Sequence, residues 1–268
     1  MIEKFITKQE MDAVLPKRNC HTHKGDYGKI LLLCGSKGYT GAAALAALGA
    51  LRSGAGLVYL GVPESIYEIE AIKLLEPVVF SLPDQEGMFD FTACDVIEKL
   101  LPKIDAVLVG PGIGRSEGSL SVVRTVLEKF KGPVVVDADG INVLSSHKYI
   151  LRDRNAPTIV TPHDGEFVRI GGVITSDRVA SAAVLAVITD GNICYVNQTG
   201  NPGMAVGGAG DVLSGIIVSL LGQGISPLLA AACAAWLHGA AGDICAQEIG
   251  QYGMLPQDKV NVLQRLLP

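Results

Sequence analysis

Charged and aromatic residues are scarce in this chain of 268 residues. Only 18% of the residues are charged and 5% are aromatic, whereas 49% are hydrophobic. The lysines and arginines form no cluster, and the formal net charge is −5. A basic patch is the electrostatic signature of a nucleic-acid-binding protein, so we expect no nucleic acid among the partners. The hydrophobic excess allows a large core and argues against disorder.

The sequence also lacks paired cysteines and an apolar run near its N-terminus. The six cysteines are scattered, and none forms a C-x-x-C pair. We therefore expect free buried thiols in a reducing cytoplasm, and neither disulfides nor a metal held by the protein. The N-terminal sequence MIEKFITKQEMDAVLPKR has no apolar run of the kind that a secretory signal peptide carries. These absences predict a cytoplasmic location.

One long stretch lacks charge altogether. No Asp, Glu, Lys or Arg lies between Asp211 and Asp243, and a membrane-spanning helix needs about 20 continuous apolar residues. The sequence GQGISP interrupts this stretch, with Ser226 suited to cap a new helix and Pro227 suited to its first position. We expect two buried helices of a soluble protein here, and no contact with a membrane.

Glycine, in contrast, is abundant at 32 residues, and short apolar runs alternate with helical patterns. Helices are predicted from Thr40 and over 119–130, and Asp190-Gly191 predicts the turn of a hairpin over 187–197. Buried strands are predicted at 29–35, 57–63, 106–112, 133–140 and 158–163. Strands that alternate with helices are typical of a parallel sheet, so the chain is predicted to be an α/β protein.

A glycine-rich loop leads directly into an apolar helix. Gly207, Gly208 and Gly210 carry no side chain, so their backbone N–H groups can approach a ligand closely. The positive end of the helix dipole adds to this, which predicts a phosphate site, although no G-K-[ST] follows as in a Walker loop. A carboxylate repels phosphate, so Asp211 is useful there if it takes a proton from an attacking hydroxyl. The alternative is that Asp211 merely caps the helix, a role that requires no glycines.

Three predicted strands end in polar or glycine-rich segments, GPGIGR, DADGIN and TPHDGEF. Ligands of open parallel sheets bind beyond the carboxyl ends of the strands. Together with GNPGMAVGGAGD, these segments make four candidate loops on one predicted edge, which favours a ligand site over four ordinary turns.

These motifs, in this order over nearly the whole chain, resemble the ADP/ATP-dependent NAD(P)H-hydrate dehydratase family of the YjeF C-terminal type. The resemblance implies one ribokinase-like domain over residues 1–268, with a mostly parallel central sheet flanked by helices on both faces. It also implies a repair reaction, in which the S epimer of NADH or NADPH hydrate is dehydrated back to NADH or NADPH. Kinase-like phosphorylation of the ring hydroxyl by ADP or ATP would create a leaving group, and no residue decides between the two nucleotides.

Roles for single residues follow from the same resemblance. Asp211 would be the general base on the hydrate hydroxyl. Gly207, Gly208 and Gly210 would hold the transferred phosphoryl group, with Gly210 also contacting the nucleotide. Asn201 would shape the wall between nucleotide and substrate. The expected substrate-binding positions are Ala42, Gly112, His163 and, more weakly, Asn142.

Several polar residues at the same edge keep an alternative interpretation. His163 could be an ordinary histidine at the end of a strand. Glu166 either caps a helix or orients a magnesium-bound water. Asp137 and Asp139 are as well suited to forming a turn as to contacting a ligand.

The resemblance also implies partners. Mg²⁺ is expected from phosphoryl transfer, held by substrate phosphates and waters, since the sequence offers no cage of ligands. A homo-oligomer, a tetramer, is implied by the habit of the family. Members are often fused to an NAD(P)H-hydrate epimerase; no stretch of this sequence resembles one, so we expect a separate epimerase in the same cell.

One segment departs from the family pattern. DRVASAAVLAVITDG, residues 177–191, passes from a helical pattern into a strand without Gly, Pro, Asn or Asp at the change. The family has a further strand and a lysine-glycine turn there, which lines the nucleotide pocket. We expect the loop at least to be a mobile segment missing from this sequence; a true deletion would weaken nucleotide binding. Two other functions stay open: a ribokinase-like kinase of a vitamin precursor, and an inactive nucleotide-binding protein.

Overall fold

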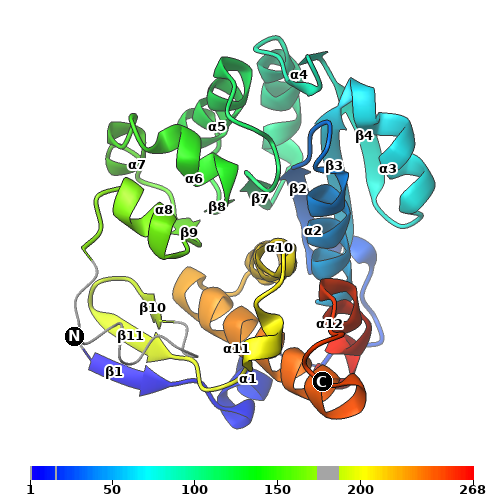
Figure 1. Cartoon of the computed structure of the whole chain (residues 1–268), viewed down its shortest axis with the longest axis vertical. Helices are drawn as coiled ribbons and strands as arrows, with labels where there is room; N and C mark the ends of the chain where they lie inside the picture. The colour runs from blue at the N-terminus through cyan, green and yellow to red at the C-terminus, as the bar shows by residue number, and fades with distance from the viewer. Residues whose placement is uncertain (1, 16, 174–186) are drawn as a thin grey trace.

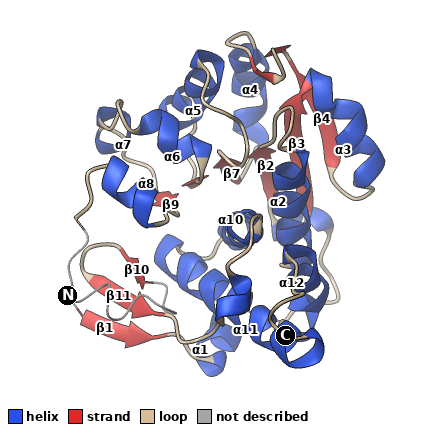
Figure 2. Ribbon diagram, viewed as in Figure 1, coloured by secondary structure: helices blue, strands red, loops and turns tan. Residues whose placement is uncertain are grey.

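The central element is a six-stranded parallel sheet, seen in the computed structural model, which describes residues 2–15, 17–173 and 187–268 (Figures 1 and 2). The strand order is β4-β3-β2-β7-β8-β9. In chain order the strands are β2 (Lys29–Leu33), β3 (Leu57–Pro63), β4 (Val78–Leu82), β7 (Ala106–Val109), β8 (Val134–Val136) and β9 (Thr158–Val160). All five predicted strands are confirmed. The strand at 57–63 has the expected bounds, whereas those predicted at 29–35, 106–112, 133–140 and 158–163 end two to four residues earlier than expected. The unpunctuated junction lies largely within 174–186, outside the described residues.

Helices cover both faces of the sheet because successive strand residues point to opposite sides. In β2, Ile30 and Leu32 belong to one hydrophobic core, and Leu31 and Leu33 belong to the other. The first core includes residues of α2 (Thr40–Arg52), α10 (Ala209–Gly222), α11 (Pro227–Ile249) and α12 (Pro256–Val262). The second includes residues of α4 (Ala93–Leu100), α5 (Glu117–Lys129), α6 (Asp139–Leu144) and α7 (Tyr149–Arg152). The predicted α/β architecture is confirmed.

A second, smaller sheet lies beside the first (Figure 1). Its order is β1-β11-β10, built from β1 (Ile2–Phe5), β10 (Val187–Thr189) and β11 (Ile193–Val196). The predicted hairpin is confirmed: β10 and β11 pair antiparallel, and Asp190 Oδ1 accepts hydrogen bonds from the turn amides. Within the described part of the chain, no strand pairs with the outer side of β9. The shorter elements are α1 (Lys8–Val14), α3 (Tyr67–Lys73), β5 (Asp84–Gln85), β6 (Met88–Phe89) and α8 (Asp164–Arg169).

The uncharged stretch forms two helices, as expected. The second, α11, begins at Pro227 with Ser226 at the capping position. It is long and apolar enough to cross a membrane by length and composition, but 67% of its most apolar segment is buried inside the fold. Its apolar surface is therefore accounted for by the core.

Helices α2 and α10 approach each other at backbone distance. A Cβ atom built on Gly215 would lie 2.2 Å from the carbonyl oxygen of Ala46, and one on Gly49 would lie 2.6 Å from that of Val212. Such distances leave no room for any side chain, so two glycines on facing helices set the spacing. This contact fixes the position of α10, and with it the start of that helix, relative to the sheet.

A lysine of α12 is buried against α11. Lys259 of α12 is 0% exposed, and its Nζ has no hydrogen-bond partner among the described residues. Burial lowers the pKa of Lys259 to about 8. Its titratable neighbours are His238 and Cys245, and burial lowers the pKa of His238 as well. A buried amine without a partner destabilises the folded state.

Replacing Lys259 with methionine is expected to raise the free energy of unfolding at pH 7 by roughly 2 to 3 kcal/mol. In the unmodified protein, burial of the charged Lys259 amine lowers the free energy of unfolding, and this loss is complete below the pKa of Lys259 in the folded state. The loss disappears as the pH approaches about 10.4, the pKa of lysine in the unfolded chain, because between the two values only the unfolded chain is protonated. Stability should therefore rise between about pH 8 and 10, and this rise should be absent in the variant. Urea unfolding at both pH values measures it. Lys131→Met, at an exposed lysine, is the control; a Lys259→Met protein less stable than the unmodified one would refute the prediction.

Candidate active site

The glycine-rich loop opens directly into α10, which starts at Ala209. Gly208 is the capping residue, with φ of 91°, and a Cβ there would also strike Leu45 Cδ1 at 2.5 Å. Gly208 is thus required by conformation and packing. Gly207 and Gly210 are exposed, and a Cβ on either would meet nothing within 4 Å. Their backbone faces open space, as an anion site at a helix start requires.

Asp211 is the third residue of α10 and does not cap it. No side-chain capping bond is found at this helix start, and no hydrogen bond to the Asp211 carboxylate is found in the described part of the chain. The cap-only alternative is therefore not supported. Burial, and secondarily the charge of Asp139, raise the pKa of Asp211 to about 6. A carboxylate with this pKa is ionised at neutral pH, yet basic enough to accept a proton.

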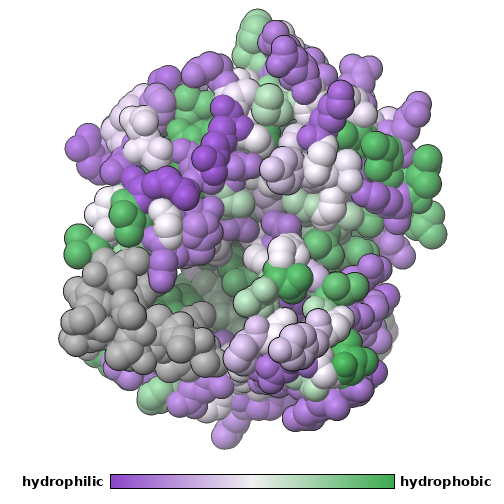
Figure 3. Space-filling model, in the orientation of Figure 1, coloured by the Kyte–Doolittle hydropathy of each residue, from purple (hydrophilic) through white to green (hydrophobic). Residues whose placement is uncertain are grey.

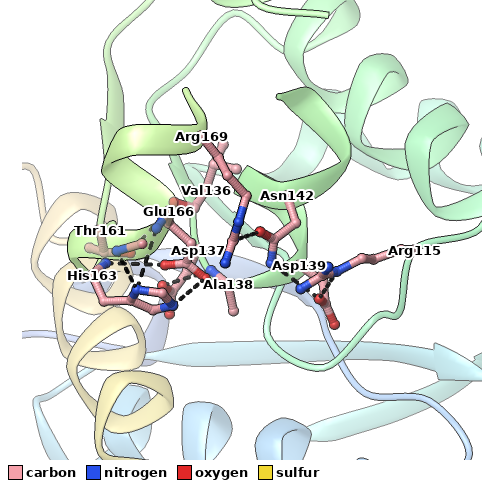
Figure 4. Close-up of polar contacts among 11 residues, drawn as sticks. Arg115, Val136, Asp137, Ala138, Asp139, Asn142, Thr161, His163, Glu166 and Arg169 are labelled. Atoms are coloured by element: carbon pink, nitrogen blue, oxygen red, sulfur yellow. Dashed lines mark hydrogen bonds and ion pairs between the residues drawn. The ribbon is translucent and has the colours of Figure 1, made fainter. Parts of the chain in front are cut away.

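Asp137 and Asp139 follow β8 and differ in environment (Figure 4). Asp139 accepts a bond from the Gly114 amide at 3.1 Å and pairs with Arg115 at 3.2 Å, so it ties the GPGIGR loop to α6. Asp137 is buried, and its Oδ1 accepts the Ala138 amide at 2.8 Å. Ala138 has a positive φ of 48°, a strained backbone for alanine of the kind that concentrates at functional sites.

A chain of polar side chains continues from Asp139 (Figure 4). Asn142 donates to Asp139 and accepts from Arg169 of α8. His163 caps α8: its Nδ1 accepts the Gly165 amide at 3.0 Å, while Glu166 accepts the His163 amide at 3.1 Å. The helix-capping alternative for Glu166 is confirmed. The imidazole of His163 is exposed, and its Nε2 lies 3.4 Å from Glu166.

Ala42 and Gly112 lie against each other across two elements. A Cβ on Gly112 would lie 2.9 Å from the Ala42 Cβ, which leaves room for nothing larger at either position. The Ser36 hydroxyl donates to the Gly112 carbonyl at 2.7 Å and holds that loop. Leu45, one turn after Ala42 on α2, touches the glycine loop at Gly208. The structure therefore brings Ala42 and Gly112 to the side of the glycine loop.

Asp243 is a positioning residue that the sequence analysis missed. Its carboxylate accepts the Gly200 amide and the Asn201 side-chain amide, both at 2.9 Å. Asn201 in turn accepts the Gly203 amide at 3.1 Å. The loop that leads to the glycines is thus anchored on α11. The sequence signal that could have identified Asp243 is its position as an acidic residue within an otherwise apolar helix.

The carboxyl edge of the sheet faces the start of α10. The surface is hollowed between α8 and this helix (Figure 3). Burial raises the pKa of Asp137, and the charge of Asp211 adds to this rise. His21 and His23, by contrast, precede β2 and lie away from these loops, with His23 paired to Asp26. Among residues 2–15, 17–173 and 187–268, no group of three His, Cys, Asp or Glu could hold a metal ion.

A parallel sheet covered on both faces, with a glycine loop and the Asp211 carboxylate at its carboxyl edge, fits a ribokinase-like α/β protein. A ribokinase-like superfamily protein of Enterococcus faecalis V583 superposes with a TM-score of 0.83 at 23% identity, covering 98% of this chain and 94% of that one. The profile of the NAD(P)H-hydrate dehydratase family matches residues 30–187 and 179–265. The chain belongs to the NAD(P)H-hydrate dehydratase family.

Curated relatives agree. The bifunctional NAD(P)H-hydrate repair enzyme of Moorella thermoacetica is 41% identical over 98% of this chain and 54% of its own length. The ADP-dependent (S)-NAD(P)H-hydrate dehydratase of Bacillus subtilis is 33% identical over 98% of this chain and 97% of its own. The chain thus spans about half the length of the bifunctional relatives that it matches, and nearly all of the B. subtilis protein.

A solved structure gives the same fold. The B. subtilis ADP/ATP-dependent NAD(P)H-hydrate dehydratase, co-crystallised with ATP and Mg²⁺, superposes with a TM-score of 0.79 at 29% identity, covering 98% of this chain and 96% of that one. The two stretches of the family match share residues 179–187, the junction where the sequence departs from the family pattern.

Proposed function

We propose that this chain dehydrates the S epimer of NADH or NADPH hydrate back to NADH or NADPH, using ADP or ATP as phosphoryl donor. The observation that carries the proposal is Asp211, a carboxylate with no hydrogen bond from the described residues, raised pKa, and a place beside a glycine loop whose backbone faces open space. Family membership and the names of the relatives support the substrate.

Each residue would act through its position. Asp211 would accept the proton of the ring hydroxyl as that oxygen forms its bond to phosphorus. The amides of Gly207, Gly208 and Gly210 would stabilise charge on the phosphoryl oxygens. Asn201, held by Asp243, would separate nucleotide from substrate. The substrate pocket would be lined by Ala42, Gly112, Asn142 and His163.

The described residues fit a nucleotide but not a protein-held metal. The open backbone at Gly207 and Gly210 suits phosphate oxygens. No cluster of metal-binding side chains occurs among the described residues, so we propose that Mg²⁺ is bound through the nucleotide phosphates and waters. It would neutralise phosphate charge during transfer.

Absorbance of the reduced nicotinamide ring tests the proposal. Purified protein is mixed with NADH hydrate, magnesium, and ADP, ATP or a non-hydrolysable ATP analogue. A rise in absorbance with ADP or ATP, and none with the analogue, is expected and identifies the donor. A stable phosphorylated product without the rise would support a small-molecule kinase. Neither signal, with no nucleotide binding, would support an inactive protein and a true deletion at the junction.

The setting of the reaction is part of the proposal. We take residues 1–268 as one catalytic domain, in the cytoplasm, where its six free cysteines stay reduced. An NAD(P)H-hydrate epimerase would supply the S epimer from the other one. Loss of that activity from the cell should leave the R epimer unrepaired.

We also propose a homo-oligomer, a tetramer. An apolar strip on α3, β4 and the segment between them supports it: Ile72 is 80% and Leu75 87% exposed, and β4 is an edge of the main sheet. This strip, visible at the right of Figure 3, is completed by Tyr67, Ile69 and Val78. Isolated apolar patches of this kind are typical of interfaces.

The double variant Ile72→Asp and Leu75→Asp is expected to shift the particle from tetramer to smaller species, because two charges would be buried in the interface without partners. Sedimentation velocity measures the mass. Ile249→Asp, at an exposed isoleucine on α11, is the control and should leave the mass unchanged. A monomeric unmodified protein, or a double variant of unchanged mass, would contradict this interface.

A further inference from the structure

A second carboxyl lies behind Asp211 and has no role in the reaction just described. Asp137 is 5% exposed, and its Oδ2 has no hydrogen-bond partner within the described part of the chain. Its Oδ1 is fixed by the amide of Ala138, whose strained backbone holds the carboxyl in place. Burial of a carboxyl oxygen without a hydrogen-bond donor destabilises the charged form of the group and favours the protonated form.

The groups around Asp137 come from α10, from the segment after β9 and from the end of β2. Helix α10 presents Asp211 and the hydroxyl of Ser214, and the segment after β9 presents the hydroxyl of Thr161. The buried thiol of Cys34 follows β2; burial raises its pKa, and the charges of Asp211 and Asp137 add to the rise. From α6, Asp139 acts on Asp211. In the structure both hydroxyls donate to backbone carbonyls, that of Ser214 to Asp211 and that of Thr161 to Val136, so the hydrogen bond found to Asp137 is the one from the Ala138 amide to Oδ1.

Burial raises the pKa of Asp137 to about 7, and the charge of Asp211 contributes to the rise. Asp211 itself has a pKa of about 6. Asp137 is the more deeply buried of the two and its Oδ2 has no donor among the described residues, so the first proton to leave the pair comes from Asp211, the more exposed residue, while Asp137 retains its own. The two carboxyls are a coupled system whose total charge is close to −1.

We propose that Asp137 is a positioning residue that keeps its proton while Asp211 is ionised, so that the site presents one negative charge to the incoming phosphoryl group. This inference rests on the proposed function. When Asp137 ionises, the pair carries two charges beside the glycine loop, and binding of the nucleotide weakens. Asp137 thereby sets the upper pH limit of nucleotide binding.

The proton balance of the phosphoryl step is simple. The O–H bond of the substrate hydroxyl breaks, and its proton goes to Asp211. The oxygen electron pair forms a new bond to phosphorus, and the bond from phosphorus to the bridging oxygen of the nucleotide breaks. The pair then holds two protons, and Asp211, which is nearer the solvent, loses one before the next turnover.

Direct titration of the carboxyl tests the coupling without any substrate. The ¹³C signal of the Asp137 carboxyl is followed against pH by NMR in the unmodified protein and in Asp211→Asn. We expect a midpoint well above an ordinary aspartate, and a fall of at least about 0.5 pH unit in the variant, because the neighbouring charge is gone. A midpoint near 4, or one unaffected by Asp211→Asn, would overturn the inference.

Nucleotide binding gives the second test. Calorimetry with ADP and with ATP, each with magnesium, is run at pH 6.5 and 8.5. We expect the unmodified protein to bind at least about fivefold more weakly at pH 8.5, and Asp137→Asn, which cannot ionise, to lose most of this dependence. Asp153→Asn, at an exposed aspartate pairing with Arg152, should keep it. Titration of the nucleotide phosphates affects the unmodified protein and Asp137→Asn equally, so it cancels when the two are compared.

The outcomes separate the two proposals. No nucleotide binding at either pH would contradict the proposed function while leaving the NMR test intact. Binding that shows the same pH dependence in Asp137→Asn as in the unmodified protein would overturn the role of Asp137 alone. If Asp137→Asn does not fold, the titration in Asp211→Asn decides.

Discussion

Replacing Asp211 with asparagine is expected to lower kcat of the dehydration about 10³-fold, within the range found for loss of a general base. The amide has nearly the shape of the carboxylate but cannot accept the proton of the ring hydroxyl. No hydrogen bond from the described residues to the carboxylate is lost, so α10 and the glycine loop should stay in place. The recovery of reduced-nicotinamide absorbance, under saturating nucleotide, measures the effect.

Two features distinguish this loss from simple damage. The unmodified enzyme should lose kcat/KM as pH falls through about 6, because a protonated Asp211 is no base, and the residual activity of the variant should lack this limb. Nucleotide binding should be kept or tightened, since a negative charge near phosphate has gone. Asp153→Asn is the matched control. A variant that retains more than about a tenth of the activity would remove Asp211 from the role of base.

Replacing Gly215 with alanine is expected to lower the free energy of unfolding by about 3 kcal/mol, as overpacking of a tight core does. The new methyl carbon would sit 2.2 Å from the carbonyl oxygen of Ala46, a backbone atom that can move only with α2. The helices must separate, and the start of α10 moves with them. A displacement of about 1 Å at a catalytic group lowers rates about 10²-fold, so the activity of the folded fraction should fall too.

Urea unfolding and the absorbance assay measure both effects of Gly215→Ala. Gly253→Ala is the matched control, because a Cβ there meets nothing within 4 Å and its backbone conformation suits alanine. A Gly215→Ala protein with unchanged stability would mean that α2 and α10 are less closely packed than the structure has them.

The sequence predicted the main sheet well because its strands are short apolar runs bounded by glycine and polar residues. The hairpin at Asp190-Gly191 and the start of α11 at Pro227 were equally local signals. The pairing of β1 with β11 was not predictable, since it joins residues nearly 200 positions apart, Ile2 and Ile193. All residues of β1 are exposed, so this strand shows no alternation of buried and exposed side chains that could identify it.

The chemistry of the candidate site was partly local as well. A run of glycines before an apolar helix predicts an anion site wherever it occurs, and a carboxylate at its end raises the question of a base. His163 and Glu166 could not be assigned in this way, because a cap and a ligand contact use the same residue types. Their capping bonds depend on the conformation of one turn.

What the sequence by itself determined is the architecture, the glycine loop and the candidate base, because periodicity, turn residues and backbone freedom are properties of neighbouring residues. Only the tertiary structure decided the rest. Asp243 anchors Asn201 from 42 residues away. Asp137 and Asp139 are alike in sequence, but Asp137 is buried with an oxygen that has no hydrogen-bond partner among the described residues, whereas Asp139 binds the Gly114 amide. The burial of a side chain and the charges near it depend on which elements meet in space. Close packing of helices, such as Gly215 against Ala46, determines which elements meet.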